Sequence, residues 1–128
     1  MKISPVLIGA FIVLAACTRP EQKDLRQGRA YESEKEFQKA VTAYDHAIKR
    51  APESAEGILA AKAGAKIAFY DLKNFQKAAD FYHYLVLASK NPDERESAQK
   101  QLSIIYFDHL ADYPSAVREL NPYQKASH

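Results

Sequence analysis

The sequence has one cysteine, four glycines and no run of lysine or arginine. A lone cysteine leaves no pair of thiols for a disulfide or a cysteine metal site. Four scattered glycines do not form the glycine-rich loops that hold phosphate groups. A formal net charge of +2 without a basic cluster lacks the electrostatic footprint of nucleic-acid binding. These absences exclude phosphate-loop chemistry and argue against nucleic-acid partners.

No group of residues points to catalysis or to a metal site. The histidines are His46, His83, His109 and His128. None has a second His or Cys three or four residues away, which is the spacing that zinc sites use. Glu32, Glu34 and Glu36 lie close together, but a solvated helix end explains them better than an acid/base pair. We therefore expect no catalytic residue, no metal and no cofactor.

The composition is that of one helical domain. The chain has 128 residues, of which 27% are charged and 47% hydrophobic, ordinary values for a single core. Ala, Lys, Glu, Gln and Leu abound, and β-branched residues are sparse after the first 15 positions. This usage favours an all-α fold.

An internal repeat organises the chain. Phe37-Gln38-Lys39-Ala40 recurs 38 residues later as Phe75-Gln76-Lys77-Ala78, and Tyr113-Pro114-Ser115-Ala116 follows another 38 residues on. The register extends to aromatic residues six positions before each copy and to large side chains four positions after each alanine. Those residues are Tyr31, Phe69 and Phe107, and Tyr44, Tyr82 and Leu120. A repeat of this length is typical of stacked structural units.

Hydrophobic periodicity and helix-ending residues divide each unit into a helical hairpin. The predicted helices are Lys23–Ser33 and Phe37–Arg50, then Ala55–Leu72 and Phe75–Ser89, then one from Pro92 to Leu110 and a short one from Tyr113 to about Asn121. Ser54 is the predicted N-cap of the third helix. Asn121-Pro122 cuts the third hairpin short, and no polar capping helix follows it. Either the chain is a fragment, or a partner covers this end.

Two helices of the second unit have unusual faces. Small residues form a continuous strip at helical spacing along the first helix: Gly57, Ala60, Ala61, Gly64, Ala65 and Ala68. We expect the preceding helix to pack against this strip, and the alternative is a floor for a bound peptide. The second helix is apolar nearly all round, which predicts burial on several sides. The alternative is that Tyr84 or Leu87 is exposed to a partner.

The first unit resembles the tetratricopeptide repeat, a helix-turn-helix unit of about 34 residues. Small, aromatic and proline residues carry the resemblance: Gly28, Tyr31, Ala40, Tyr44, Ala47 and Pro52. The resemblance implies an all-α solenoid of about three hairpins over residues 22–121, the third incomplete. Two features depart from the family pattern: the 38-residue spacing, and Asp24, Lys62 and Lys100 at positions where a large apolar residue is usual.

The first 16 residues are predicted to be a signal peptide, because Lys2 precedes a short apolar run. Leu14-Ala15-Ala16-Cys17 resembles the lipobox of bacterial lipoproteins. That resemblance implies cleavage before Cys17, acylation of its sulfur and its new amino group, and attachment to a membrane. In lipoproteins of enteric-type bacteria an aspartate after the cysteine favours the inner membrane, so the resemblance, with Thr18 at that position, implies the outer membrane. The alternatives are an ordinary signal peptide with an incidental cysteine, or an uncleaved anchor.

Residues 17–21 are then an acylated N-terminus and tether, and residues 122–128 are a frayed tail. In the tetratricopeptide family the first helix of each hairpin lines a groove that binds peptides. Carrying that register over gives the candidate groove residues Arg29, Glu32, Ser33, Ile67, Tyr70, Asp71, Gln101, Ile105, Asp108 and His109.

The resemblance implies an adaptor on the periplasmic side of a bacterial membrane that binds a protein or peptide segment of the cell envelope. The general plan is similar to lipoproteins of outer-membrane protein assembly and of secretin assembly. Two other hypotheses remain open at this point. One is a non-catalytic recruiter of a cell-wall enzyme. The other is a structural lipoprotein whose self-assembly covers the open third unit.

Overall fold

The computed structural model describes residues 18–120, which form helices joined by short loops and contain no strand. The α-helices of this part are α2 (Pro20–Ser33), α3 (Phe37–Arg50), α4 (Ala55–Lys66), α5 (Phe75–Ala88), α6 (Pro92–Ile104) and α7 (Tyr113–Leu120). Two π-helical segments, η1 (Ile67–Asp71) and η2 (Ile105–His109), continue α4 and α6. The expected all-α class is confirmed for these residues. The expected signal peptide, Cys17 and the tail 122–128 lie outside them.

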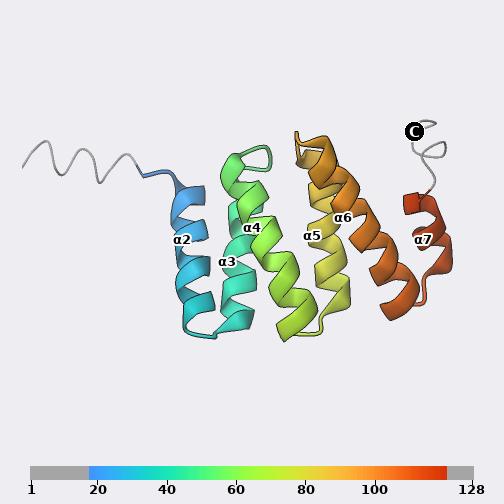
Figure 1. Ribbon diagram of the computed structural model, residues 1–128. Coiled ribbons are helices and arrows are strands. Elements are labelled where there is room, and N and C mark those ends of the chain that lie inside the picture. The colour runs from blue at the N-terminus through green and yellow to red at the C-terminus, as the bar shows by residue number, and fades with distance from the viewer. Residues whose placement is uncertain (1–17, 121–128) are drawn as a thin grey trace, which may run out of the picture.

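The helices stand side by side in chain order, and each runs antiparallel to the next (Figure 1). Every helix packs against its neighbours in sequence, and α2 also contacts α4. The row consists of three hairpins, α2 with α3, α4 with α5, and α6 with α7. The third hairpin is the shortest because α7 has only 8 residues. Each broad face of this row of helices is therefore built from helices of different hairpins.

The repeat of the sequence is also present in the backbone. Lys35, Lys73 and Ala111, at 38-residue spacing, have positive φ values of 60°, 52° and 51°. Each lies in the turn between the two helices of its hairpin. The amides of Leu72 and Leu110 each donate to the carbonyl five residues earlier, at 3.0 Å in both hairpins. The chain therefore reverses direction in the same way in successive units.

Several predicted boundaries differ from the structure. The first helix begins at Pro20 rather than Lys23, because the fixed φ of proline suits the first helical position. The expected tether over 17–21 is therefore wrong at its end, since Pro20 and Glu21 are helical. The helices expected to run to Leu72 and Leu110 end instead in the π-turns η1 and η2. Such turns take up additional residues within a helix.

Within residues 18–120, side chains cap the first turns of α4, α5, α6 and α7, and at α7 the Asp112 carboxylate accepts a hydrogen bond from the Ser115 amide at 3.2 Å. Ser54 is the N-cap of α4 as predicted, and its hydroxyl accepts a hydrogen bond from the Gly57 amide at 2.9 Å. Asn74 caps α5 and Asn91 caps α6 in the same manner, each through its side-chain oxygen. Such caps satisfy amides that have no partner within the helix. The caps therefore fix the residues at which these helices begin.

The strip of small residues on α4 is buried, which excludes a peptide-binding floor. A Cβ at Gly64 would lie 2.7 Å from the Phe81 ring, and one at Gly57 would lie 2.6 Å from the Tyr84 hydroxyl. Both neighbours belong to α5, so the following helix packs on the glycines of this strip, while the preceding helix α3 also packs against α4, as expected. The Phe81 ring and the Tyr84 hydroxyl of α5 occupy the space that the two glycines leave.

Helix α5 is buried along one side and exposed at its end. Phe81 and Leu85 are buried in the core, while Leu87 is 72% exposed. Tyr84 is half-buried, and its hydroxyl donates a hydrogen bond to the Pro52 carbonyl at 2.5 Å. Within residues 18–120, no helix combines the length and the hydropathy that crossing a membrane requires.

Candidate protein-binding groove

A groove with a volume of about 500 Å³ lies between α4 and α6, with α5 as its floor. Its lining residues are Lys62, Lys66, Tyr70, Tyr82, Leu85, Asn91, Asp93, Glu94, Ser97, Ala98 and Gln101. The hairpin arrangement creates it, because α4 and α6 are the first helices of successive hairpins and stand on the same side of α5. We call it the α4–α6 groove.

A second hollow of about 450 Å³ adjoins this groove toward the loops that precede α4 and α6. Lys62, Asn91 and Glu94 line both hollows. Apolar side chains of α4, including Ile58 and the exposed Leu59, contribute to the second one. The two hollows together offer a track along α4 that is longer than either hollow alone.

An ion pair crosses the groove where the two hollows meet. Lys62 Nζ lies 2.7 Å from Glu94 Oε2, and the Ser89 hydroxyl donates to Glu94 Oε1 at 2.6 Å. The Lys62 ammonium is the first cause that holds the pKa of the Glu94 carboxyl below its ordinary 4.5, and the Ser89 hydrogen bond is the second. Both favour the charged carboxylate. The pair links α4 to α6 across the groove.

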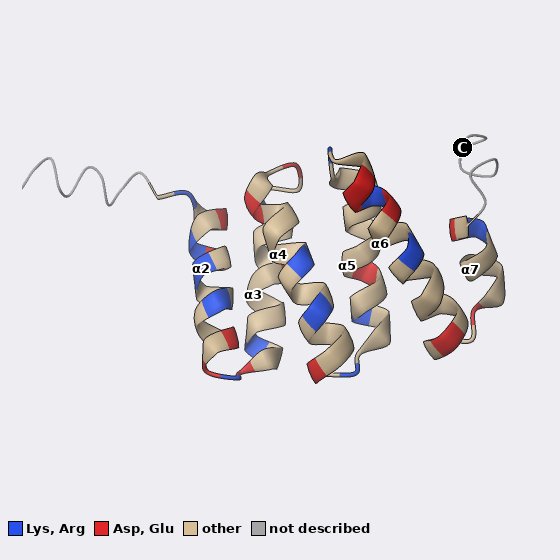
Figure 2. Ribbon diagram, in the orientation of Figure 1, with Lys and Arg blue, Asp and Glu red and all other residues tan. Residues whose placement is uncertain are grey.

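The rest of the groove combines charge with aromatic surface. Lys66 is exposed and has no ion-pair partner within the described part of the chain. Tyr70 is 63% exposed, whereas Tyr82 is half-buried on the floor. Burial raises the pKa of the Tyr82 hydroxyl, and nearby Tyr70 raises it further. Basic and acidic residues both occur over α4 and α6, so together these helices do not form a surface of one sign (Figure 2).

The predicted groove residues fall into three groups. Tyr70 and Gln101 line the α4–α6 groove. Ile67 and Ile105 are buried in the core, so their assignment as partner-contacting residues is wrong. Each stands at the start of a π-turn, where hydrogen bonding to the fifth residue changes which side chains share a face. Apolar side chains at those positions turn inward.

The other predicted residues are exposed but lie outside the groove. They are Arg29, Glu32 and Ser33 on α2, Asp71 at the end of η1, and Asp108 and His109 on η2. Three of them have partners within the protein, and the Ser33 hydroxyl donates to the Ala30 carbonyl at 2.7 Å. The Tyr44 hydroxyl donates to Glu32 Oε2 at 2.7 Å, and the His109 ring stacks on Phe75.

Sequence reasoning missed several residues that form the groove, namely Lys62, Lys66, Glu94 and Ser97. The sequence does contain a pattern that could have identified them. Lys62 and Lys66 are four residues apart, as are Ser97 and Gln101, so each pair shares one face of its helix. The assignment concentrated on the ends of the first helices, whereas the groove runs from Lys62 to Tyr70 on one side and from Asn91 to Gln101 on the other.

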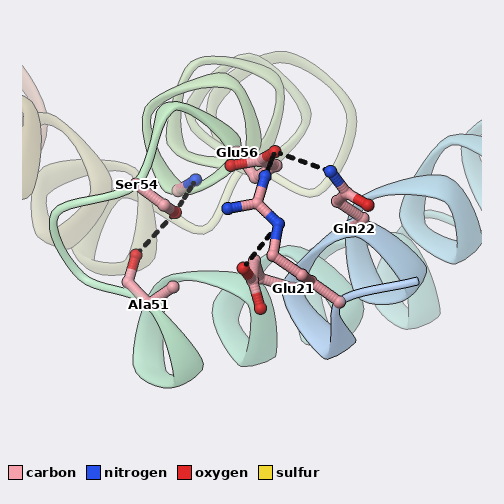
Figure 3. A network of polar contacts seen from close by, with 7 residues as sticks. Glu21, Gln22, Ala51, Ser54 and Glu56 are labelled. Carbon is pink, nitrogen blue, oxygen red and sulfur yellow. Dashed lines mark hydrogen bonds and ion pairs between the residues drawn. The ribbon is translucent and has the colours of Figure 1, made fainter. Parts of the chain in front are cut away.

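A polar network fixes the start of the helical row (Figure 3). The Arg19 guanidinium lies 2.7 Å from Glu56 Oε1 on α4 and 3.4 Å from Glu21 Oε1 on α2. The Gln22 amide also donates to Glu56 Oε1, at 3.2 Å. Arg19 is therefore held against the second hairpin. In the sequence, only Thr18 separates Arg19 from Cys17.

Within the described residues, no group of three or more His, Cys, Asp or Glu side chains is placed to hold a metal ion. Comparison with known proteins gives no assignment, since no protein-family model, curated protein or solved structure matches the chain.

Proposed function

We propose that this protein is a lipid-anchored tetratricopeptide adaptor of a bacterial envelope, which binds a segment of another envelope protein in the α4–α6 groove. Cys17 carries the lipid, and the outer membrane, facing the periplasm, is its location. The adaptor class rests on the tetratricopeptide pattern of the first unit together with the 38-residue repetition of the turns at Lys35, Lys73 and Ala111.

The observation that carries the binding role is the groove itself. Its volume of about 500 Å³ suits a few side chains of a peptide rather than a whole domain. Tyr70 and Tyr82 offer aromatic contact area, and Lys66 offers a cation to an acidic residue of the segment. A segment with an apolar side chain next to a carboxylate fits these features best.

The lipobox supports the anchor, and the polar network supports a short connection to it. Because Arg19 is held by Glu56, an acylated Cys17 leaves Thr18 as the only residue free to act as a tether. The loops that precede α4 and α6 lie along the same edge of the row as the start of α2, the upper edge in Figure 1. In this proposal that edge of the row faces the membrane, and the groove opens parallel to the membrane surface.

Photo-crosslinking in living cells tests the binding role. Benzoylphenylalanine placed at Ser97, in the groove, is expected to give one covalent protein adduct, which Lys66→Glu weakens. The matched control is His83, which is exposed on α5 and lies outside the groove. Equal adducts from both positions, or none from Ser97, would contradict the proposal. Identification of the adduct decides between an assembly component and a cell-wall enzyme.

Membrane fractionation tests the anchor separately. The wild-type chain is expected in the outer-membrane fraction, and Cys17→Ser is expected to release it. Thr18→Ser serves as the control, because it changes the neighbouring residue and leaves the sulfur in place. If the Cys17→Ser protein still sediments with membranes, the lipid anchor is refuted, whatever the crosslinking result.

A further inference from the structure

The last hairpin leaves uncovered a face that the second hairpin has covered. Four apolar positions of hairpin two recur 38 residues later: Phe69 as Phe107, Phe75 as Tyr113, Ala79 as Val117, and Tyr82 as Leu120. In hairpin two these side chains are buried or half-buried. Their counterparts are 57%, 53%, 60% and 63% exposed. We call Phe107, Tyr113, Val117 and Leu120 the terminal face.

The structure shows what covers this face in hairpin two. Helix α6 packs along α5, and η2 brings the His109 ring onto the aromatic pair. The His109 ring stacks on Phe75 at 4.1 Å and meets the edge of Phe69 at 5.1 Å between centroids. The cover is therefore a helix that buries one narrow side, including Ala98 and Leu102, and is followed by a planar ring.

The terminal face has the same geometry before anything binds to it. Phe69 and Phe75 meet edge to face at 5.4 Å and 73°, and Phe107 and Tyr113 do so at 5.0 Å and 68°. The pair that accepts His109 is thus repeated with its rings already arranged. The charged residues of α7, Arg118 and Glu119, stand near its C-terminal end (Figure 2), and the positions of the terminal face on this helix are apolar.

We infer that the terminal face binds an amphipathic helix of a partner protein, which stacks on α7 and η2 as α6 and η2 stack on hairpin two and places a planar ring against Tyr113. This is a second interface, separate from the α4–α6 groove and independent of the function proposed for it.

A second copy of the chain is a poorer occupant. Head-to-tail stacking would place the outer side of α2 on the terminal face. The exposed residues of α2 include Lys23, Arg26 and Arg29, whose charges would be buried against apolar side chains. Face-to-face pairing would rest mainly on two copies of an 8-residue helix. A partner helix with an apolar side meets neither difficulty.

The chain supplies its own probe for this face, namely a synthetic peptide of residues 92–110, which covers hairpin two in the structure. A peptide of this length forms little helix alone in water, so it needs a constraint. Glu96 and Lys100 form an exposed ion pair four residues apart, at 2.8 Å, and a lactam between them holds the helix without altering its packing side. Fluorescence anisotropy then measures its binding to the full-length chain, purified in the form that cells produce.

We expect saturable binding that Val117→Lys weakens by about tenfold or more, because a buried ammonium without a partner is strongly disfavoured. A peptide with His109→Ala should bind roughly two- to tenfold more weakly, through loss of the ring contact. Leu87→Lys is the matched control, since Leu87 is 72% exposed but lies on α5, outside the face, and this variant should bind like the wild type.

Two results would overturn the inference. Absence of saturable binding, or binding that Val117→Lys leaves unchanged, would show that the face does not accept a helix. Light scattering that finds a dimer in the wild type and a monomer in Val117→Lys would show that a second copy occupies it instead. Circular dichroism of each variant, with a helix content equal to the wild type, separates these outcomes from a failure to fold.

Discussion

The rings of Phe75 and His109 stack with centroids 4.1 Å apart and planes inclined by 16°. Phe75 is the first residue of α5, and His109 is the last residue of η2, so the contact joins the second hairpin to the third. Phe69 completes the cluster from the end of hairpin two's first helix. Two rings of the second hairpin and one of the third therefore fix the spacing of these hairpins near the turns before α5 and α7.

His109→Ala should lower the free energy of unfolding by about 1 kcal/mol, the usual worth of an aromatic pair beyond the area it buries. Urea denaturation measures the change. A double-mutant cycle with Phe75→Leu should give a coupling of about 0.5–1.5 kcal/mol between the two positions. His83→Ala, an exposed change on α5, should have almost no effect. A coupling near zero would mean that the rings do not hold the hairpins together.

Gly64→Ala should destabilise the fold although alanine is the better helix former. At an exposed helical position, replacing glycine by alanine raises the free energy of unfolding by about 1 kcal/mol. The reverse change at an exposed position of α2, Ala30→Gly, is the control and should lower it by a similar amount. At Gly64 the new Cβ would lie 2.7 Å from the Phe81 ring, and such overpacking costs about 1–3 kcal/mol. Thermal unfolding should therefore show a lower Tm for both variants. A higher Tm for Gly64→Ala would mean that α4 and α5 are farther apart than described.

Ala111→Gly should raise the stability by about 1 kcal/mol, because the left-handed conformation costs an alanine that amount and a glycine little. Ala111 has a φ of 51° in the turn before α7. Ala55→Gly, at an exposed helical position, is the matched control and should lower stability. Urea midpoints of the two variants should move in opposite directions. A shift of the same sign in both would contradict the turn geometry.

Stability should fall with acid in part through Glu94. Its pKa is held below 4.5 by Lys62 and Ser89, so its contribution is complete above that value and is lost as the pH falls through the lower, folded pKa. Between about pH 5 and 3, Glu94→Gln should show a shallower loss of stability than the wild type. Glu53→Gln, an exposed change, should follow the wild-type curve. Identical slopes in all three proteins would refute the Lys62 pairing in solution.

Much of the fold could be predicted because the repeat marks the same points in each unit. Phe37, Phe75 and Tyr113 begin α3, α5 and α7 as expected, and the turns before them contain the three positive-φ residues. The π-turns were not predictable from periodicity, since an apolar pattern does not reveal whether an amide bonds to the fourth or the fifth residue before it.

The groove was harder to predict than the helices that form it. Assigning Ile67 and Ile105 to a binding surface relied on a family register, and one residue of error rotates a helical side chain by about 100°. For Tyr70 and Gln101 the assignment agrees with the structure, since both line the groove. The Lys62–Glu94 pair joins residues of two hairpins, and neither its partners nor its place across the groove follows from the spacing within one helix.

The central claim is that the α4–α6 groove binds a segment of a partner, and chemical-shift mapping tests it most directly. The partner segment crosslinked from Ser97 is identified by mass spectrometry, synthesised, and titrated into the ¹⁵N-labelled full-length chain. We predict that amide shifts concentrate at Lys66, Tyr70, Ser97 and Gln101 and are absent at His83. Shifts confined to the outer side of α5, or an unchanged spectrum at saturating peptide, would contradict the claim.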